Sequence, residues 1–305
     1  MAFAAFGSSN PQANAKPTKT GKFVIALLTP GLLYLGLFFL TPLISLIMVS
    51  LEAPDPNGYG YAEYVPALEF ANYATVVQEY LPHIIRSFGY ALTATVLALL
   101  ISYPIAYFIG VKARAWPLLQ KLMLTLVIAP FFISFLLRTL AWKQIFSNES
   151  WIVTTLQELH VLGPNDYVVG TPFMVIFGLT YNFIPFMTLP LYTSLERLDV
   201  RYLEAGADLY ASPSKVFRKV TLPLSMPGII SGTLLTFIPI AGDYVNASGD
   251  FLGSSETAMM GNVIESNYLT INDYPAASAM SVLLMGVILI LVSVYVKRSG
   301  TEDLL

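Results

Sequence analysis

The chain has 305 residues, of which 55% are hydrophobic and only 11% are charged, against about 25% charged residues in an ordinary soluble domain. Its mean hydropathy is +0.65, and several apolar runs reach about 20 residues, the length that crosses a bilayer. It has no cysteine and two isolated histidines, which excludes disulfides and thiolate chemistry and argues against a metal site. The composition predicts a membrane protein, and no catalytic or zinc site is expected at the two histidines.

Six apolar segments are long enough to be transmembrane helices. Residues 1–22 form a polar tail without an apolar face, which predicts disorder. Residues 23–298 are expected to form an all-α membrane domain, followed by a short tail, residues 299–305. The expected spans are Phe23–Leu51, Arg86–Gly110, Leu122–Trp142, Thr171–Ser194, Leu222–Val245 and Ala276–Val296. Short amphipathic helices are predicted near Tyr73–Tyr80 and Trp151–His160.

Prolines interrupt several of these spans. Pro30 and Pro42 lie in the first span, where each removes a backbone donor, so we expect kinks there.

The basic residues predict the orientation of the six spans. If the spans alternate in direction, all of the 16 basic residues except Arg86, Arg138 and Lys143 fall on the side of the N-terminus. Basic residues are enriched in cytoplasmic loops, so both termini are predicted to be cytoplasmic. Most of the 19 acidic residues fall on the other side. One interpretation is that only basic residues are excluded from the outer side, so the acidic residues there have no function of their own. The other is that they form a negative vestibule that attracts cations.

The cytoplasmic segment at residues 195–221 predicts a pair of short helices. The first runs from about Asp199 to Asp208, and the second follows Ser212, a good N-cap, with Pro213 in the first helical position. One interpretation is a hairpin anchored on the membrane surface by its Arg and Lys side chains. The other is a surface presented to a partner, because this loop gathers much of the charge of a poorly charged chain.

Residues 204–223 of this segment resemble the cytoplasmic signature of importer permeases of the ATP-binding-cassette class. That signature reads Glu-Ala-Ala, three residues, Gly, nine residues, then Ile-x-Leu-Pro. Here Glu204-Ala205-Gly206 stands for Glu-Ala-Ala, and Val220-Thr221-Leu222-Pro223 closes the signature at the same spacing. Tyr210 occupies the position of the Gly, which suits a turn with positive φ that Tyr adopts only at a cost. We therefore expect either a different turn or a Tyr210 that packs into a partner.

The resemblance implies that this segment is a coupling loop docked on a separate ATPase, with Glu204 paired to a basic residue there. The chain has no G-x-x-x-x-G-K-[ST] sequence, so no P-loop is predicted, and ATP and Mg would belong to the partner. The chain itself is expected to carry no cofactor and no enzymatic activity. The candidate coupling residues are Glu204, Ala205, Gly206, Asp208, Tyr210, Ser212, Pro213, Leu222 and Pro223.

The same resemblance implies the other partners and the location. A second homologous permease would form a heterodimer with this chain, and two cytoplasmic ATPase subunits would bind below it. A periplasmic or lipid-anchored binding protein would deliver the solute. The implied location is the bacterial cytoplasmic membrane, with several spans in lipid, and no nucleic acid is implied.

Sequences outside the loop point to a substrate class. The stretches YNFIPFMTLPLYTSLERLD, GNVIESNYLTINDYPAASAMS and SFLLRTLAWKQIFS resemble the first permease of polyamine importers of the spermidine/putrescine type. The resemblance covers nearly the whole chain from Phe23. The same subgroup handles opines, other small organic cations that resemble amino acids, and ferric ions, so these substrates stay open.

A polyamine would need carboxylates and aromatic faces along its path. Asp243, with Tyr244 and Asn246 beside it near the end of the fifth span, is the main candidate; the alternative is a polar helix end at the interface. Further path candidates are Tyr181, Asn182, Trp142 and Arg138, for which core packing, an ion pair or an interfacial anchor are the alternatives. Glu265, Tyr268 and Asp273 are candidate contacts with the binding protein.

Two other functional classes make different demands on the sequence. A stand-alone secondary transporter or channel would need charges buried in mid-span and an internal repeat, whereas the candidate charges lie near span ends and no repeat is evident. An intramembrane enzyme would need paired His, Asp or Ser motifs inside spans, and none occurs.

Overall fold

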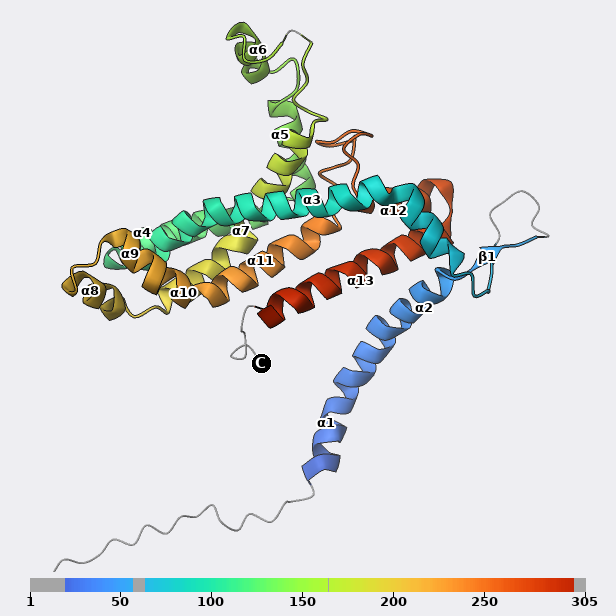
Figure 1. Ribbon diagram of the computed structural model, residues 1–305, viewed down its shortest axis with the longest axis horizontal. Helices are drawn as coiled ribbons and strands as arrows, with labels where there is room; N and C mark the ends of the chain where they lie inside the picture. The colour runs from blue at the N-terminus through green and yellow to red at the C-terminus, as the bar shows by residue number, and fades with distance from the viewer. Residues whose placement is uncertain (1–19, 57–63, 164, 299–305) are drawn as a thin grey trace, which may run out of the picture. The chain divides into compact units, whose positions relative to one another are not determined.

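The computed structural model describes residues 20–56, 64–163 and 165–298, most of them in helices (Figure 1). By length and composition, four helices in these ranges can cross a membrane, or six if each of two bent pairs counts as one span. The predicted all-α fold is confirmed. The predicted tails lie outside the described residues, except that the first helix already begins at Thr20.

The described part of the N-terminal unit, from Thr20 onwards, is one helical run that continues one residue past the end of the unit at Met48. It consists of α1 (Thr20–Leu35), the π-helical turn η1 (Gly36–Leu40) and α2 (Thr41–Val49). The backbone N–H of Thr41 donates to the Gly36 carbonyl, and its hydroxyl donates to the same oxygen at 3.3 Å. The wider turn directly precedes Pro42, which cannot donate, so the helix adjusts its hydrogen bonds there without ending.

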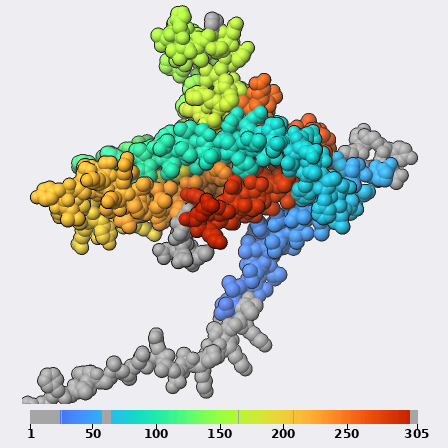
Figure 2. Space-filling view, viewed as in Figure 1, coloured from blue at the N-terminus to red at the C-terminus, as the bar shows by residue number. Residues whose placement is uncertain are grey.

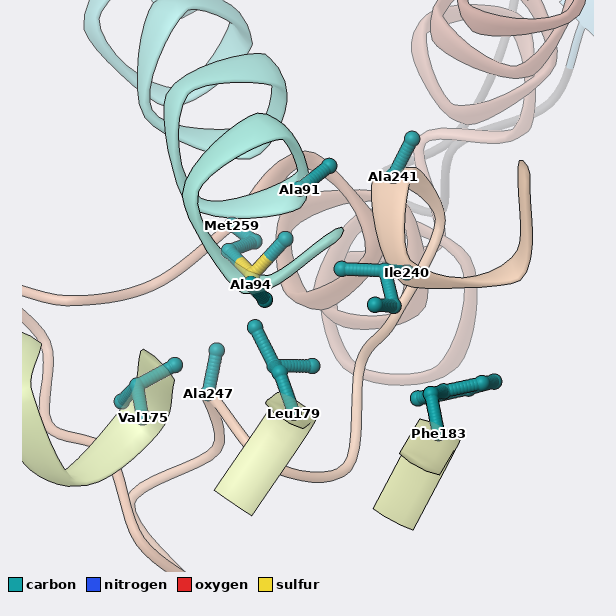
Figure 3. Close-up of a cluster of buried hydrophobic side chains, with 9 residues drawn as sticks. All are labelled: Ala91, Ala94, Val175, Leu179, Phe183, Ile240, Ala241, Ala247 and Met259. Atoms are coloured by element: carbon teal, nitrogen blue, oxygen red, sulfur yellow. The ribbon is translucent and has the colours of Figure 1, made fainter. Parts of the chain in front are cut away.

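The second unit is built on three helices that pack together: α3 (Ala71–Tyr107), α7 (Pro172–Glu196) and α11 (Met226–Ala241). Small residues recur along α3 at helical spacing and are buried, which allows its backbone to approach α7 closely. One buried cluster joins all three helices (Figure 3). It consists of Ala91, Ala94, Val175, Leu179, Phe183, Ile240, Ala241, Ala247 and Met259.

The second predicted span was wrong in its length. The amphipathic helix expected near Tyr73–Tyr80 and the span expected from Arg86 form one helix, α3, which continues through η2 (Phe108–Lys112) and η3 (Ala113–Ala115). Pro82 lies inside α3, where it costs one backbone hydrogen bond but does not end the helix.

The third predicted span was wrong in its shape. The chain forms α4 (Pro117–Ile128), η4 (Ala129–Phe132) and α5 (Phe135–Ile145), and the two arms meet at an angle of 93°. Ile133 has φ −105° and ψ 137°, an extended conformation that breaks the helix. Pro130 and the extended residues after it explain the bend, whereas the uniform apolar character of the stretch had predicted a single rod.

The remaining elements are short apart from the last. β1 (Ala53–Pro54) pairs antiparallel with β2 (Tyr64–Val65). The short helix predicted near Trp151–His160 is present as α6 (Trp151–Glu158), where the Ser150 hydroxyl accepts from the N–H of Val153. After α11 come α12 (Met260–Ser266), η6 (Asn267–Ile271) and the sixth expected span, α13 (Tyr274–Arg298).

Candidate functional site

The predicted pair of short helices is present. It consists of α8 (Val200–Asp208), α9 (Pro213–Val216), η5 (Phe217–Thr221) and α10 (Leu222–Leu224). Figure 2 shows this segment, coloured from gold to orange, at one end of the second unit. We call residues 199–223 the hairpin. Ser212 has the extended backbone of an N-cap and Pro213 is the first helical residue, but the Ser212 side chain makes no capping hydrogen bond.

The turn between α8 and α9 adopts a left-handed conformation at Tyr210, where φ is 53°. The N–H of Ala211 donates to the carbonyl of Gly206 at 3.1 Å, a bond that spans five residues and closes a Schellman-type helix end. Such an end usually has glycine at the left-handed position. The turn therefore has a positive φ at the position where the signature has glycine, although the residue here is tyrosine.

The other signature residues divide into exposed and packed positions. A Cβ added to Gly206 would lie 2.9 Å from Cγ2 of Val216, so this glycine lets α8 and α9 pack closely. Leu222 is half-buried, whereas the remaining candidates face solvent. These exposed candidates are Glu204, Ala205, Asp208, Tyr210, Ser212, Pro213 and Pro223.

A residue that the sequence analysis counted only as a topological charge fixes the base of the hairpin. The guanidinium of Arg114 donates to the carbonyl oxygens of Leu195 at 2.6 Å and Leu198 at 2.9 Å, and also to those of Gly110 and Glu196. The last carbonyls of a helix lack intrahelical partners, and a cation placed there satisfies them. Arg114 thus ties the end of α3 to the end of α7, directly before the hairpin.

Two further contacts reinforce this junction. The Tyr192 hydroxyl donates to Oε1 of Glu196 at 2.5 Å, and the Gln120 amide lies 3.4 Å from the same oxygen. A Cβ on Gly110 would lie 3.2 Å from Cβ of Leu195, so the two backbones are in close contact. Nothing in the sequence pattern marks Arg114 as different from its basic neighbours.

A buried polar network lies beyond the C-terminal end of α11. The helix ends at Ala241, four residues before the predicted end of the fifth span, so Asp243 lies outside it. Asn246 donates to the Asp243 carboxylate twice, from its backbone N–H at 2.8 Å and from its side-chain amide at 3.0 Å. Asn182 of α7 then donates to Oδ1 of Asn246 at 3.1 Å and to Oγ1 of Thr139 at 3.3 Å. The structure therefore brings together the candidates Asp243, Asn246 and Asn182.

Burial dominates the electrostatics of Asp243, which is 7% exposed. It raises the pKa of the carboxyl from 3.8 to about 6, although hydrogen bonds from Asn246, Ala247 and Val245 oppose the shift. An acid held at this energetic cost is either a structural brace of the loop or a functional group.

Gly178 of α7 makes room for this network, and we expect Gly178→Ala to destabilise the protein. The added Cβ would lie 2.3 Å from Cδ1 of Leu252 and 2.8 Å from Oδ1 of Asn246. Displacing Asn246 breaks its bond with Asn182, and overpacking of this kind costs about 2 kcal/mol. Gly286→Ala on α13 is the matched control, because its Cβ would meet no atom within 4 Å. Equal melting temperatures for the two variants would contradict the expectation.

A cavity of about 540 Å³ lies against the same loop. Its polar lining includes Tyr244, Asn262 and the carboxylates of Asp250 and Glu265; Asp243 is not one of the lining residues. Partial burial, and the nearby Asp250, raise the pKa of Glu265. Two acids, an aromatic ring and an amide are groups that bind ammonium ions.

Arg138 of α5 has an unusual environment. It is 9% exposed, and its Nε and Nη1 are buried without a hydrogen-bond partner in the described structure. Its guanidinium lies 5.9 Å from the centroid of the Phe135 ring. Neither of these two nitrogens makes the expected hydrogen bond to an acid within the described ranges.

The other two basic residues on the predicted outer side hold the loop after α11. Nη1 of Arg86 donates to the carbonyl of Ala258 at 2.8 Å, and Nζ of Lys143 donates to the carbonyl of Asp250 at 2.8 Å. These contacts give a local structural reason for two basic residues to lie on the predicted outer side, where basic residues are otherwise rare.

Trp142 and Tyr181 belong to an aromatic cluster. Their ring centroids are 5.1 Å apart, and Trp142 also packs at 4.8 Å against Phe177. This is the core-packing role that the sequence analysis kept as an alternative.

The three residues considered for binding-protein contact have different environments. Asp273 accepts from the N–H of Ala276 at 3.0 Å and so begins α13. Tyr268 is exposed and packs edge-on against Tyr274, while Glu265 lines the cavity. Over the described residues, no group of three or more His, Cys, Asp or Glu side chains could hold a metal ion.

Comparisons with known proteins identify the family. The profile of the family described as "Binding-protein-dependent transport system inner membrane component" matches residues 125–299. A spermidine/putrescine transport system permease of Haemophilus influenzae is 32% identical, with 92% of this chain and 94% of that protein covered. The corresponding Escherichia coli K12 permease is also 32% identical, with 92% and 95% covered.

Solved structures share the fold. A bacterial ABC transporter involved in the import of the acidic polysaccharide alginate matches with a TM-score of 0.64 at 17% identity, covering 93% of this chain and 97% of that one. The MetNI methionine ABC transporter in an inward-facing conformation matches with a TM-score of 0.51 at 18% identity, covering 74% and 94%. The chain therefore belongs to the family of binding-protein-dependent transport system inner membrane components, and is a multi-pass inner-membrane transport subunit rather than an enzyme.

Proposed function

We propose that this chain is the permease subunit of an ATP-driven importer that passes a polyamine, such as spermidine or putrescine, across the cytoplasmic membrane. The observation that carries the proposal is the similarity to spermidine/putrescine permeases over 92% of the chain. The exposed hairpin, tied through Arg114 to two membrane helices, supports a separate ATPase as the energy source.

The proposed assembly contains four kinds of subunit. This chain pairs with a second, homologous permease, two ATPase subunits dock on the two hairpins, and a binding protein delivers the solute from outside. ATP and Mg bind to the ATPase subunits. In this arrangement the hairpin and both termini are cytoplasmic, as the distribution of basic residues predicts.

The cavity beside the loop after α11 is the proposed entrance for the cation. Asp250 and Glu265 would each attract an ammonium group, and the ring of Tyr244 would contact it by a cation–π interaction of about 0.5–2 kcal/mol. Asp243 is proposed to lie deeper on the path, where its carboxylate becomes available when the loop rearranges. Its present bonds to Asn246 would be exchanged for bonds to the substrate.

The experiment is ATP-dependent uptake by the purified assembly in liposomes, with labelled spermidine outside and ATP inside. The charge reversal Glu204→Lys is expected to reduce both ATPase co-purification and uptake at least about tenfold, equivalent to about 1.4 kcal/mol. Glu158→Lys, the same change at an exposed acid of α6, is the matched control and should leave both unchanged. Uptake by the chain alone without ATP would instead support a secondary transporter.

Competition between solutes tests the substrate class. Excess putrescine should inhibit spermidine uptake, whereas opines, cationic amino acids and ferric ions should not. If one of these solutes inhibits uptake and putrescine does not, the chain would still be an importer permease, but its substrate would be that solute rather than a polyamine.

A further inference from the structure

The strained residue at the tip of the hairpin is an aromatic one. Of the described residues other than glycine, His160, Tyr210 and Asn272 have positive φ. Asn adopts this conformation readily because its short side chain bonds to nearby backbone, whereas a bulky side chain is disfavoured there. Tyr210 thus holds a conformation that costs the folded chain free energy and that glycine would adopt without strain.

Contacts of the Tyr210 side chain within the described structure do not offset the free energy of this conformation. It is 99% exposed, and its neighbour Leu209 is 81% exposed. No hydrogen bond or ring contact of the Tyr210 side chain is found in the described parts of the structure. Backbone strain that internal contacts do not offset is typical of sites that contact a partner.

The surroundings of the tip resemble the centre of a protein interface. Tyr is among the residues enriched at binding hot spots, where an apolar anchor is surrounded by polar neighbours. The exposed neighbours of Leu209 and Tyr210 on the hairpin include Glu204, Asp208 and Lys215. Both signs of charge therefore surround an apolar tip.

We infer that Tyr210 is the anchor residue with which the hairpin binds its ATPase partner, by inserting its ring into an apolar pocket of that protein. This inference rests on the proposed function. The partner pocket should have the width of one phenol ring, a polar group for the hydroxyl, and basic residues that face Glu204 and Asp208. A membrane surface is the less suitable partner for the tip: anionic lipid would attract the exposed basic residues of the hairpin, but it would repel Asp208, which lies two residues from Tyr210.

The experiment compares Tyr210→Gly, Tyr210→Asn and Tyr210→Phe in the complete permease assembly. Gly and Asn relieve the strain, so both should raise the melting temperature by about 2 °C. The same two variants should bind the ATPase at least about tenfold more weakly, which corresponds to about 1.4 kcal/mol. Phe keeps the ring and should stay within about threefold of the unchanged protein.

Opposite changes in stability and in association are the signature of an anchor. If the Gly variant binds the ATPase as tightly as the unchanged protein, or more tightly, the inference is overturned. Tyr202→Ala removes an exposed ring from the helical part of the hairpin and is the matched control, expected to be neutral in association.

Two further measurements separate the alternatives. Glu204→Lys is measured in the same binding assay: if it abolishes binding and Tyr210→Gly does not, only the anchor is wrong, whereas if neither has an effect the proposed coupling fails. Tyr210→Trp fluorescence in brominated lipid tests the membrane. Quenching beyond that of the native Trp116, Trp142 and Trp151, measured in the unchanged protein, would assign the tip to the bilayer and overturn the inference. No such additional quenching is expected when the ATPase is bound.

Discussion

Arg114→Ala is expected to uncouple ATP hydrolysis from uptake and to lower the free energy of unfolding by about 3 kcal/mol. Hydrogen bonds from a charged group contribute about 1.5–3 kcal/mol each, and partial exposure of Arg114 reduces their sum. Without the guanidinium, the carbonyls of Leu195 and Leu198 lose their donor and the base of the hairpin is no longer tied to α3. The measurement is the ratio of solute imported to ATP hydrolysed in liposomes, together with the melting temperature.

The control for Arg114 is Lys112→Ala, which removes an exposed positive charge two residues away. It should preserve both stability and the transport ratio. Arg114→Lys should recover part of the stability, because an ammonium group can reach one or two of the carbonyls but lacks the planar fork of a guanidinium. If Arg114→Ala lowers stability while the transport ratio is unchanged, Arg114 stabilises the junction without transmitting motion.

Asp243→Asn is expected to stabilise the protein while it reduces polyamine uptake at least about tenfold, because the neutral amide no longer pairs with an ammonium group. The pKa of Asp243 is raised from 3.8 to about 6, so the unfolded chain releases this proton more easily than the folded chain. Stability must therefore fall as the pH rises from about 4 to about 6 and then stay level, with a total loss of about 3 kcal/mol. A neutral asparagine does not experience that loss.

The difference in stability between the Asp243→Asn variant and the unchanged protein should therefore grow with pH. The introduced amide can keep both hydrogen bonds if the amides of Asn246 and Asn182 rotate, since Oδ1 of Asn182 is a buried acceptor without a partner in the described structure. Unfolding midpoints measured between pH 4 and pH 8 check the stability, and uptake at pH 7.5 checks the function. Unchanged uptake in a more stable variant would make Asp243 a brace of its loop and remove it from the path.

The sequence predicted the elements of this fold better than their continuity. Hydropathy identifies apolar stretches, but it does not distinguish a proline that a helix tolerates from one that ends it. Pro82 lies inside α3, whereas the stretch around Pro130 and Ile133 bends by 93°. The difference lies in the extended backbone that follows Pro130, which a single sequence does not reveal.

The candidate site was predictable where a local pattern carried the information. The two helices of the hairpin followed from cap residues and spacing, and the resemblance to the family signature singled out Tyr210; its left-handed turn, which was only one of the alternatives, came from the structure. Arg114 was not, because its partners are the carbonyl oxygens of a helix end about 80 positions later, and backbone acceptors leave no mark in the side-chain sequence. Asp243 was identified as an acid near a span end, but its partnership with Asn182 depends on the tertiary structure.

Arg86 and Lys143 do not neutralise the carboxylates of Asp250 and Glu265, which affects the electric field at the proposed outer face. Within the described residues, both cations bind carbonyl oxygens of the loop after α11 rather than carboxylates. The two cationic side chains thus hold the loop through its backbone, and they form no ion pair with the carboxylates of Asp250 and Glu265 in the described structure. An approaching cation would experience their field over about one Debye length, roughly 8 Å in physiological salt. The rate of solute capture should therefore fall with rising ionic strength, while the fastening of the loop, which joins charges to neutral dipoles, changes much less.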